Sequence, residues 1–137
     1  MRKLLFIVFA LLISITSICS ASVITTHLEK WENINAKEEN STYYVDKTDI
    51  KYNKEYILFS LAAVAADGKS DDIYKIKYYI DDDMFIVTEM TLYIDDKLHD
   101  SVKYPLPDIG KVKPGSTLDI ACQYTMSLIL KGYGTKI

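Results

Sequence analysis

The sequence predicts an α+β domain, in which an antiparallel sheet of about six strands carries one C-terminal helix packed on one of its faces. Two patterns predict this fold. Segments with apolar residues at every second position recur between residues 27 and 104 and are separated by short polar turns, as in a meander of antiparallel strands. The segment 116–131 instead places its apolar residues at helical spacing. A further apolar segment, expected to be a signal helix, precedes the domain.

Residues 1–21 have the organisation of a secretory signal peptide. Two basic residues are followed by an uncharged apolar run over 4–18 and then by small residues. The run is shorter than the roughly 20 residues that a membrane span needs, so no stable span is expected after cleavage. We expect cleavage after Ala21, with cleavage one residue earlier or later as alternatives. The remaining domain, 22–137, is then exported to the periplasm or to the cell surface and extracellular space.

Net charge limits the classes of partner expected for this domain, and cysteine content limits its disulfides. The formal net charge is −3 and becomes more negative once the basic residues of the signal are lost. An acidic chain disfavours nucleic acid as a partner. Cys19 leaves with the signal, so Cys122 has no partner for an internal disulfide. We interpret Cys122 as a small buried apolar residue.

Six segments have the residue pattern of strands. They cover 27–34, 42–48, 55–65, 72–80, 84–94 and 97–104. The segment 55–65 is apolar on both faces, which predicts a central strand; a helix is the alternative, and the Asp67-Gly68 turn that follows favours the strand. The segments 51–54 and 105–115 are expected to be irregular, the second because it holds all three prolines.

Regular alternation in two of these segments assigns side chains to faces. The segment 72–80 is expected to place on one face Tyr74, Ile76, Tyr78 and Ile80, and on the other Lys75, Lys77 and Tyr79. The segment 84–94 is expected to place on one face Met84, Ile86, Met90, Leu92 and Ile94.

The predicted helix has recognisable ends. Ser116 is a favourable N-cap, and Asp119 complements the helix dipole in the first turn. Lys131 and Gly132 are typical of a helix C-terminus. The face expected to cover the sheet carries Leu118, Ala121, Cys122, Thr125, Met126 and Ile129.

Motifs for catalysis or metal binding are sparse in this sequence. His27 and His99 lack metal-ligand spacing and are interpreted as surface residues. Aspartates at 71–72, 81–83 and 95–96 fall at predicted strand ends; a calcium site is the alternative, but solvated turn residues are the preferred interpretation. The sequence contains no GxSxG or phosphate-loop motif. We therefore expect no enzymatic activity, no cofactor and no metal.

The 11 tyrosines are the one excess in composition. Our preferred interpretation is that most are ordinary sheet residues, with Tyr43, Tyr74 and Tyr78 packed under the helix. The functional interpretation assigns three others to the uncovered face of the sheet as protein-contact residues. These three are Tyr44, Tyr79 and Tyr93.

Several pieces of the sequence follow one another in an informative order. They are Trp31, "YYVDKTDI" (43–50), "DGK" (67–69), "YYIDDDMFIVTEMTLYIDDKLHDSV" (78–102) and "VKPGS" (112–116). In this order they resemble the bacterial surface-adhesin protein E family of small exported proteins. The resemblance implies an antiparallel sheet with a C-terminal helix packed on it. It also implies that "YYVD" builds a core strand and that Asp46 caps the turn before Ile50.

The resemblance further implies a protein-binding role, because the best-known family member adheres to host extracellular-matrix and serum proteins. Family members carry a cysteine where this chain has Asp82 and another later in the final helix than Cys122, so the family disulfide is not expected here. The function we expect is an exported, non-enzymatic cell-envelope protein, an adhesin-like module that binds a protein partner. The alternatives are a periplasmic structural or assembly component and a small inhibitor of a secreted hydrolase.

Overall fold

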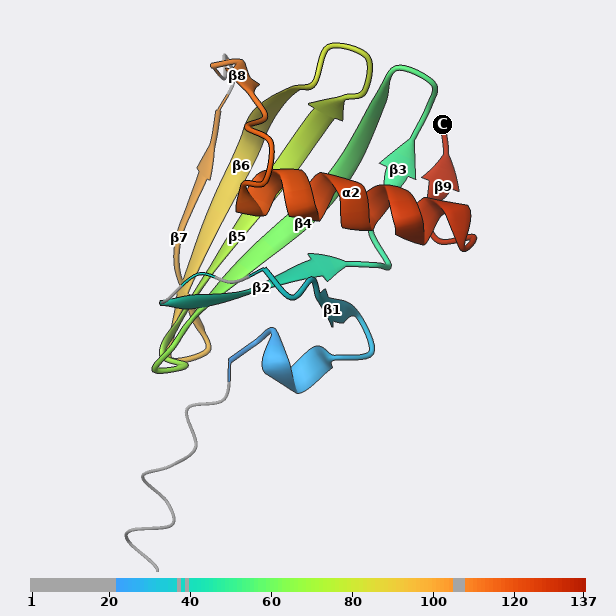
Figure 1. Cartoon of the computed structure of the whole chain (residues 1–137). Helices are drawn as coiled ribbons and strands as arrows, with labels where there is room; N and C mark the ends of the chain where they lie inside the picture. The colour runs from blue at the N-terminus through green and yellow to red at the C-terminus, as the bar shows by residue number, and fades with distance from the viewer. Residues whose placement is uncertain (1–21, 37, 39, 105–107) are drawn as a thin grey trace, which may run out of the picture.

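The computed structural model describes residues 22–36, 38, 40–104 and 108–137, so the expected signal helix lies outside the described residues. The fold is one twisted sheet with the helix α2 (Thr117–Leu130) lying across one face (Figure 1). We call this face the helix face and the opposite one the outer face. The predicted α+β class, with one C-terminal helix packed on the sheet, is confirmed.

In the described part of the chain the sheet has nine strands, six of which form its main path. In spatial order these are β1 (Trp31–Asn33), β2 (Ser41–Asp46), β4 (Tyr56–Ala65), β5 (Ser70–Tyr79), β6 (Met84–Ile94) and β7 (Lys97–Lys103). Neighbours on this path are all antiparallel. The three remaining strands have two residues each and are β3 (Lys51–Tyr52), β8 (Gly110–Lys111) and β9 (Thr135–Lys136).

The strand β4 lies in the middle of the sheet and is covered on both sides, as its apolar pattern predicted. Ile57, Phe59 and Leu61 belong to the main hydrophobic cluster under α2. Ala62 and Val64 belong to a second cluster on the outer face. Alternate residues of one strand thus contribute to two cores, because successive side chains point to opposite faces.

The second cluster exists because the N-terminal segment folds over the outer face. Its buried members are Ile24, Trp31, Ala62 and Val64, and Tyr44 and Ile73 pack against them. The main cluster includes Val45, Ile76, Tyr78 and Leu128. The predicted packing of tyrosines under the helix is confirmed for Tyr78, which is buried, and Tyr43 and Tyr74 pack against the same cluster.

The ends of α2 agree with the sequence-based expectation. The Ser116 hydroxyl accepts a hydrogen bond from the backbone N–H of Asp119 (3.2 Å), and the chain leaves the helix at Lys131 and Gly132, the latter at φ +97°. The fully buried stripe consists of Ala121, Cys122, Thr125 and Leu128. Leu128 was missing from the predicted face, whereas Leu118, Met126 and Ile129 lie beside the stripe and are only partly buried.

The strand predicted over 27–34 is wrong in its first half. Thr25–His27 form a turn of 3-10 helix, η1, and only Trp31–Asn33 are extended. Hydrogen bonds to Ser22 support this turn: the backbone N–H of Ile24 donates to the Ser22 hydroxyl (3.1 Å) and that of Thr26 to the Ser22 carbonyl (3.1 Å).

The predicted face of 84–94 is also wrong, because a β-bulge interrupts β6. Lys75 pairs with Glu89 but the next residue, Ile76, pairs with Val87, so Thr88 is an extra residue. Before the bulge, Met84 and Ile86 oppose Tyr79 and Lys77 on the outer face. After the bulge, the residues on the helix face are Met90, Leu92 and Ile94.

Two segments predicted to be irregular contain short strands. In 51–54, β3 pairs with β4 and in parallel with β9, and in 105–115, β8 pairs with Met84 and Phe85 of β6. These pairings join residues far apart in the sequence, and neither strand is long enough to show alternation. Residues 105–107 lie outside the described part.

The "YYVD" segment builds core and turn together. Val45 is fully buried in the main cluster. Asp46 is also buried, and its carboxylate accepts hydrogen bonds from the Thr48 N–H (2.9 Å) and hydroxyl (2.7 Å) while pairing with the Lys30 ammonium (3.2 Å). Asp46 therefore caps the turn that leads to Ile50, as expected.

Cys122 is a free, buried thiol, and burial raises its pKa to about 12, with smaller contributions from the carboxylates of Asp119 and Asp83. At pH 8 only about one native thiol in 10⁴ is then a thiolate.

We expect a Cys19→Ser version of the chain to be nearly inert to a thiol reagent at pH 8 and to react fully in denaturant. Rapid labelling without denaturant would show that Cys122 is not buried between α2 and the sheet.

Candidate functional site

The main candidate site is a hollow on the helix face that α2 does not cover. The helix begins in front of β5 and β6 and runs away from β7, which leaves this side of the sheet open (Figure 1). The hollow measures about 280 Å³ and is lined by Tyr74, Phe85, Val87, Met90, Tyr104 and Asp108. We call it the apolar hollow.

The register of the sheet explains why the hollow is apolar. Val87 opposes Ile76 and Phe85 opposes Tyr78, so both continue the rows that form the main core under the helix. Farther along β6, Tyr74, Met90 and Val102 form one row across β5, β6 and β7. Among the described residues, none covers the core where it extends past the helix, and Val102 and Tyr104 remain 36% and 40% exposed.

Carboxylates lie beside this apolar floor. Asp72 and Asp100 oppose Leu92 from its two sides, in the row next to Met90 on the same face. Asp108 belongs to the lining itself. Partial burial raises the pKa of Asp72, and burial also raises the pKa of Tyr74, with further contributions from Asp72 and Tyr104.

Glu38 is an exposed carboxylate that joins β2 to the first turn of α2. Its carboxylate accepts hydrogen bonds from the Tyr43 hydroxyl (2.7 Å) and from the hydroxyl of Thr117 in the first turn of α2. These two bonds lower the pKa of Glu38, while burial and the adjacent Glu38 raise the pKa of Tyr43 to about 12. Glu38 is therefore ionised at neutral pH and adds a negative charge where β2 meets the start of α2.

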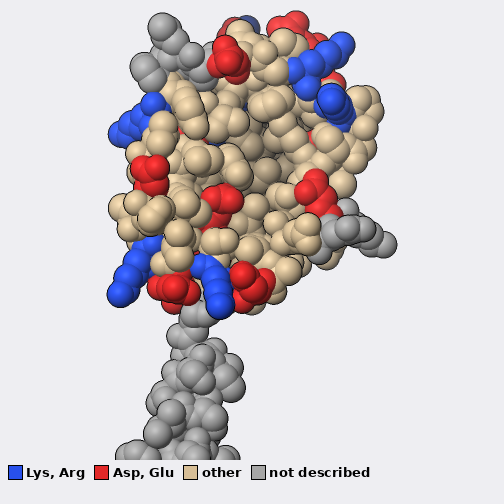
Figure 2. Space-filling model, turned by 90° about the vertical axis from the view of Figure 1, so that its left-hand side faces the viewer, with Lys and Arg blue, Asp and Glu red and all other residues tan. Residues whose placement is uncertain are grey.

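Figure 2 shows this side of the molecule in space-filling form. Its middle is hollowed and mostly uncharged, acidic side chains are spaced around the hollow, and the lysines lie towards the outline. This arrangement suits an apolar group that carries positive charge at its margins, because apolar contact and charge attraction then favour the same ligand.

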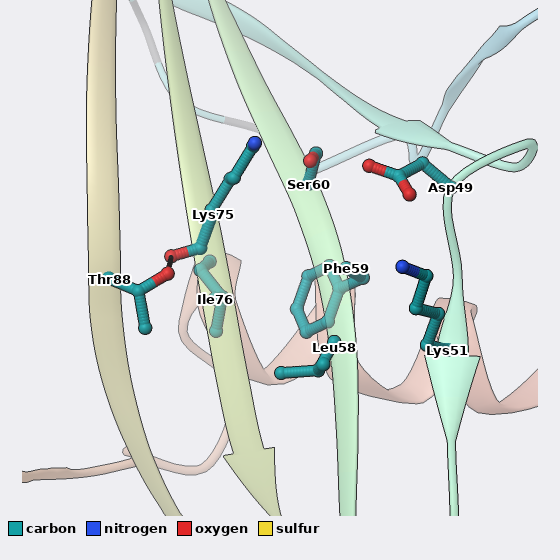
Figure 3. Close-up of a pocket in the computed structure, with 8 residues that line it drawn as sticks. All are labelled: Asp49, Lys51, Leu58, Phe59, Ser60, Lys75, Ile76 and Thr88. Carbon is teal, nitrogen blue, oxygen red and sulfur yellow. Dashed lines mark hydrogen bonds between the residues drawn. The ribbon is translucent and has the colours of Figure 1, made fainter. Parts of the chain in front are cut away.

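A second depression lies on the outer face and is more polar (Figure 3). It measures about 230 Å³ and is lined by Asp49, Lys51, Leu58, Phe59, Ser60, Lys75, Ile76 and Thr88. Lys75 pairs with Glu89 at 3.6 Å, and Asp49 and Lys51 lie near one another at the β3 side of the depression. The charges of opposite sign largely cancel, so no single kind of ligand is favoured here.

The three predicted contact tyrosines do not form one surface. Tyr44 packs against the second cluster under the N-terminal segment. Tyr79 lies at one end of the β5–β6 ladder, edge-to-face with Tyr56 at 6.2 Å, and the Lys77 ammonium lies 4.0 Å from the Tyr56 ring centroid. Tyr93 lies towards the other end of the ladder, opposite Asp71.

Residues of the apolar hollow were not identified as a site from the sequence. Tyr74, Met90 and Leu92 were recognised only as apolar strand residues, and such residues are normally covered. Nothing in their local pattern shows how far the helix reaches across the sheet. The one available signal was Tyr104, an aromatic residue directly before the proline-containing segment.

Within residues 22–36, 38, 40–104 and 108–137, no group of three or more His, Cys, Asp or Glu side chains is arranged to hold a metal ion. His27 and His99 are exposed, and His27 lies 3.1 Å from the Glu29 carboxylate. None of the helices in the described chain is both long enough and apolar enough to cross a membrane.

The fold and the hollow of the described residues define a class of protein: a single-sheet α+β domain in which the C-terminal helix α2 covers only part of a sheet face. Comparisons of the chain with protein-family models, with curated proteins and with solved structures gave no match.

Proposed function

We propose that this is an exported, non-enzymatic protein of the cell envelope that binds a protein partner in the apolar hollow. The observation that carries the proposal is the uncovered row Tyr74, Met90 and Val102, which continues a hydrophobic core into solvent. Contiguous exposed apolar surface with a polar rim is typical of a protein interaction site. Export follows from the signal-peptide pattern of residues 1–21.

The chemistry of the partner follows from the charges around the hollow. Asp72, Asp100 and Asp108 flank the apolar floor, and the hollow's own lining contains no lysine or arginine. A partner segment with apolar side chains flanked by lysine or arginine would bury the floor and pair with these carboxylates. An adhesin would use such a surface on a host protein; an assembly component or hydrolase inhibitor would use it on an envelope or secreted partner.

Two methionines of β6 offer a matched test. Met90 lies in the hollow and Met84 on the outer face, and both are partly buried. Peptides selected from a random phage-displayed library on the wild-type protein are expected to combine apolar with basic residues. Met90→Lys should weaken their binding at least about tenfold, which corresponds to roughly 1.4 kcal/mol. Met84→Lys should change their binding less than about twofold.

Salt provides the second part of this test. Binding should weaken between low and physiological ionic strength, because the rim charges are solvent-exposed and are screened over about 8–10 Å. Selected peptides without basic residues, or peptides that bind Met90→Lys as tightly as the wild type, would contradict the proposal. Circular dichroism of both variants establishes that each remains folded.

A further inference from the structure

Asp71 is a buried carboxylate held by the first described residue of the chain. It lies in β5 with a relative exposure of 2%, and the Ser22 hydroxyl lies 2.8 and 2.9 Å from its two oxygens. The backbone N–H of Val23 donates to the same carboxylate at 3.0 Å. Ser22 is itself only 4% exposed, so these contacts lie inside the fold.

Asp71 has no cationic partner in the part of the chain that the structure describes. Asp46 provides the comparison: it is buried to the same degree, with 3% exposure, but it pairs with the Lys30 ammonium. The carboxylate of Asp96 acts on Asp71 with the same sign of charge, so it also disfavours ionisation of Asp71. Burial is the largest cause of the raised pKa of Asp71.

A buried carboxylate is normally paired, because an unpaired charge in the interior is costly. Cleavage of a signal peptide produces the missing cation at this place. Hydrolysis of the Ala21–Ser22 peptide bond adds one water, which leaves a carboxylate on Ala21 and an amine on Ser22. That amine is mostly protonated at neutral pH, since α-amino groups have a pKa of about 7.7–8.0. The Ser22 nitrogen is three bonds from the hydroxyl that already contacts Asp71.

We infer that Asp71 is a binding site for the α-ammonium group of Ser22, so that removal of the signal peptide completes a buried ion pair and anchors the N-terminal segment. The inference rests on the export part of the proposed function. It does not depend on the apolar hollow, which lies on the opposite face of the sheet.

The same contacts discriminate between the three candidate cleavage sites. Cleavage after Ser22 would remove the hydroxyl that donates to Asp71 and that accepts a hydrogen bond from the Ile24 N–H. Cleavage after Ser20 would leave Ala21 as the terminal residue and move the ammonium one residue away. Cleavage after Ala21 is the only one of the three that places the ammonium on the residue bound to Asp71.

The first test is to express the complete sequence in an exporting host and to measure the intact mass of the purified product. We expect the chain to begin at Ser22. An unprocessed chain would contradict both export and this inference. A processed chain that begins elsewhere would contradict this inference and leave export supported.

The second test measures the ion pair in the processed protein. The α-amine is acetylated in denaturant at a pH where lysines are protonated, and the protein is refolded. Acetylation should lower the folding equilibrium constant of the wild type about tenfold at pH 7, and should have little effect in Asp71→Asn. Asp46→Asn is the matched control, in which acetylation should retain its full effect. An equal effect of acetylation in the wild type and Asp71→Asn would overturn the inference.

The pH dependence supplies an independent readout that needs no variant. Pairing with Asp71 should raise the pKa of the α-amine above its usual range, measured by NMR or by the pH dependence of its methylation rate. At pH values where Asp71 is ionised, the stability from this pair is then fully present below about pH 7.7 and is lost as pH rises through the raised pKa of the α-amine. An α-amine that titrates in its usual range would overturn the inference even if Asp71→Asn fails to fold.

Discussion

Replacing Leu128 with aspartate is expected to leave the domain unfolded. Leu128 is 1% exposed and lies in the main cluster between α2 and the sheet. Truncating such a residue to alanine costs about 2–5 kcal/mol. An aspartate adds the penalty of burying a charge without a partner, so the total approaches the roughly 5–15 kcal/mol by which a domain is stable. Loss of NMR dispersion and of a cooperative thermal transition would report the unfolding.

Leu130 is the matched control for this prediction. It belongs to the same helix but is 89% exposed, so Leu130→Asp should change the free energy of unfolding by no more than about 0.5 kcal/mol. A Leu128→Asp protein with the melting temperature of the wild type would show that α2 does not cover the sheet with this stripe. Leu118 and Met126 are less decisive positions, because both side chains are only partly buried.

Trp31→Ala should have the second-largest effect and should test the core on the outer face. Trp31 is 5% exposed and packs with Ile24, Ala62 and Val64. Replacing a buried tryptophan with alanine costs about 3–5 kcal/mol. We expect a lower urea midpoint by circular dichroism, which is the suitable probe because Trp31 is the only tryptophan.

Leu28 is the corresponding control, since it lies in the same segment and is 55% exposed. Leu28→Ala should cost less than about 0.5 kcal/mol. If Trp31→Ala is equally mild, the N-terminal segment contributes little to folding, and the second cluster is not a core. Both clusters include residues of β4. Leu128→Asp therefore tests the core on one face of this strand, and Trp31→Ala tests the core on the other.

Much of the fold was predictable from local patterns. The two-sided apolar character of 55–65 identified β4 as central, and Ser116, Asp119 and Gly132 located the ends of α2. Each of these features depends on a few adjacent residues and on backbone or side-chain groups within one turn. Such features can therefore be predicted from the sequence.

The error in the faces of β6 arose because a distant partner decides the local structure. Thr88 has the residue type of an ordinary strand position, yet the pairing of Lys75 with Glu89 and Ile76 with Val87 makes it a bulge. One extra residue reverses the faces of everything that follows, because the side-chain period of a strand is two. For the same reason the split of β6 between Met84 on one face and Met90 on the other was not visible.

The candidate site depends even more on long-range structure. Tyr74 and Met90 could be identified as apolar strand residues, but their exposure depends on where α2 crosses the sheet. That position is set by the packing of Leu128 and its neighbours against the sheet. It is also set by the segment that leads into α2, because β8 in this segment pairs with β6. The proposed binding surface is thus a part of the core that α2 leaves uncovered.

The sequence by itself determined which segments become the long strands and the helix α2, and how that helix begins and ends, because propensity, alternation and capping act between near neighbours. Tertiary structure alone decided how the two faces of the sheet are divided. It placed Ser22 against Asp71 on one face and left the apolar hollow open on the other. Those outcomes depend on strand register and helix placement, which residues far apart in the chain establish together.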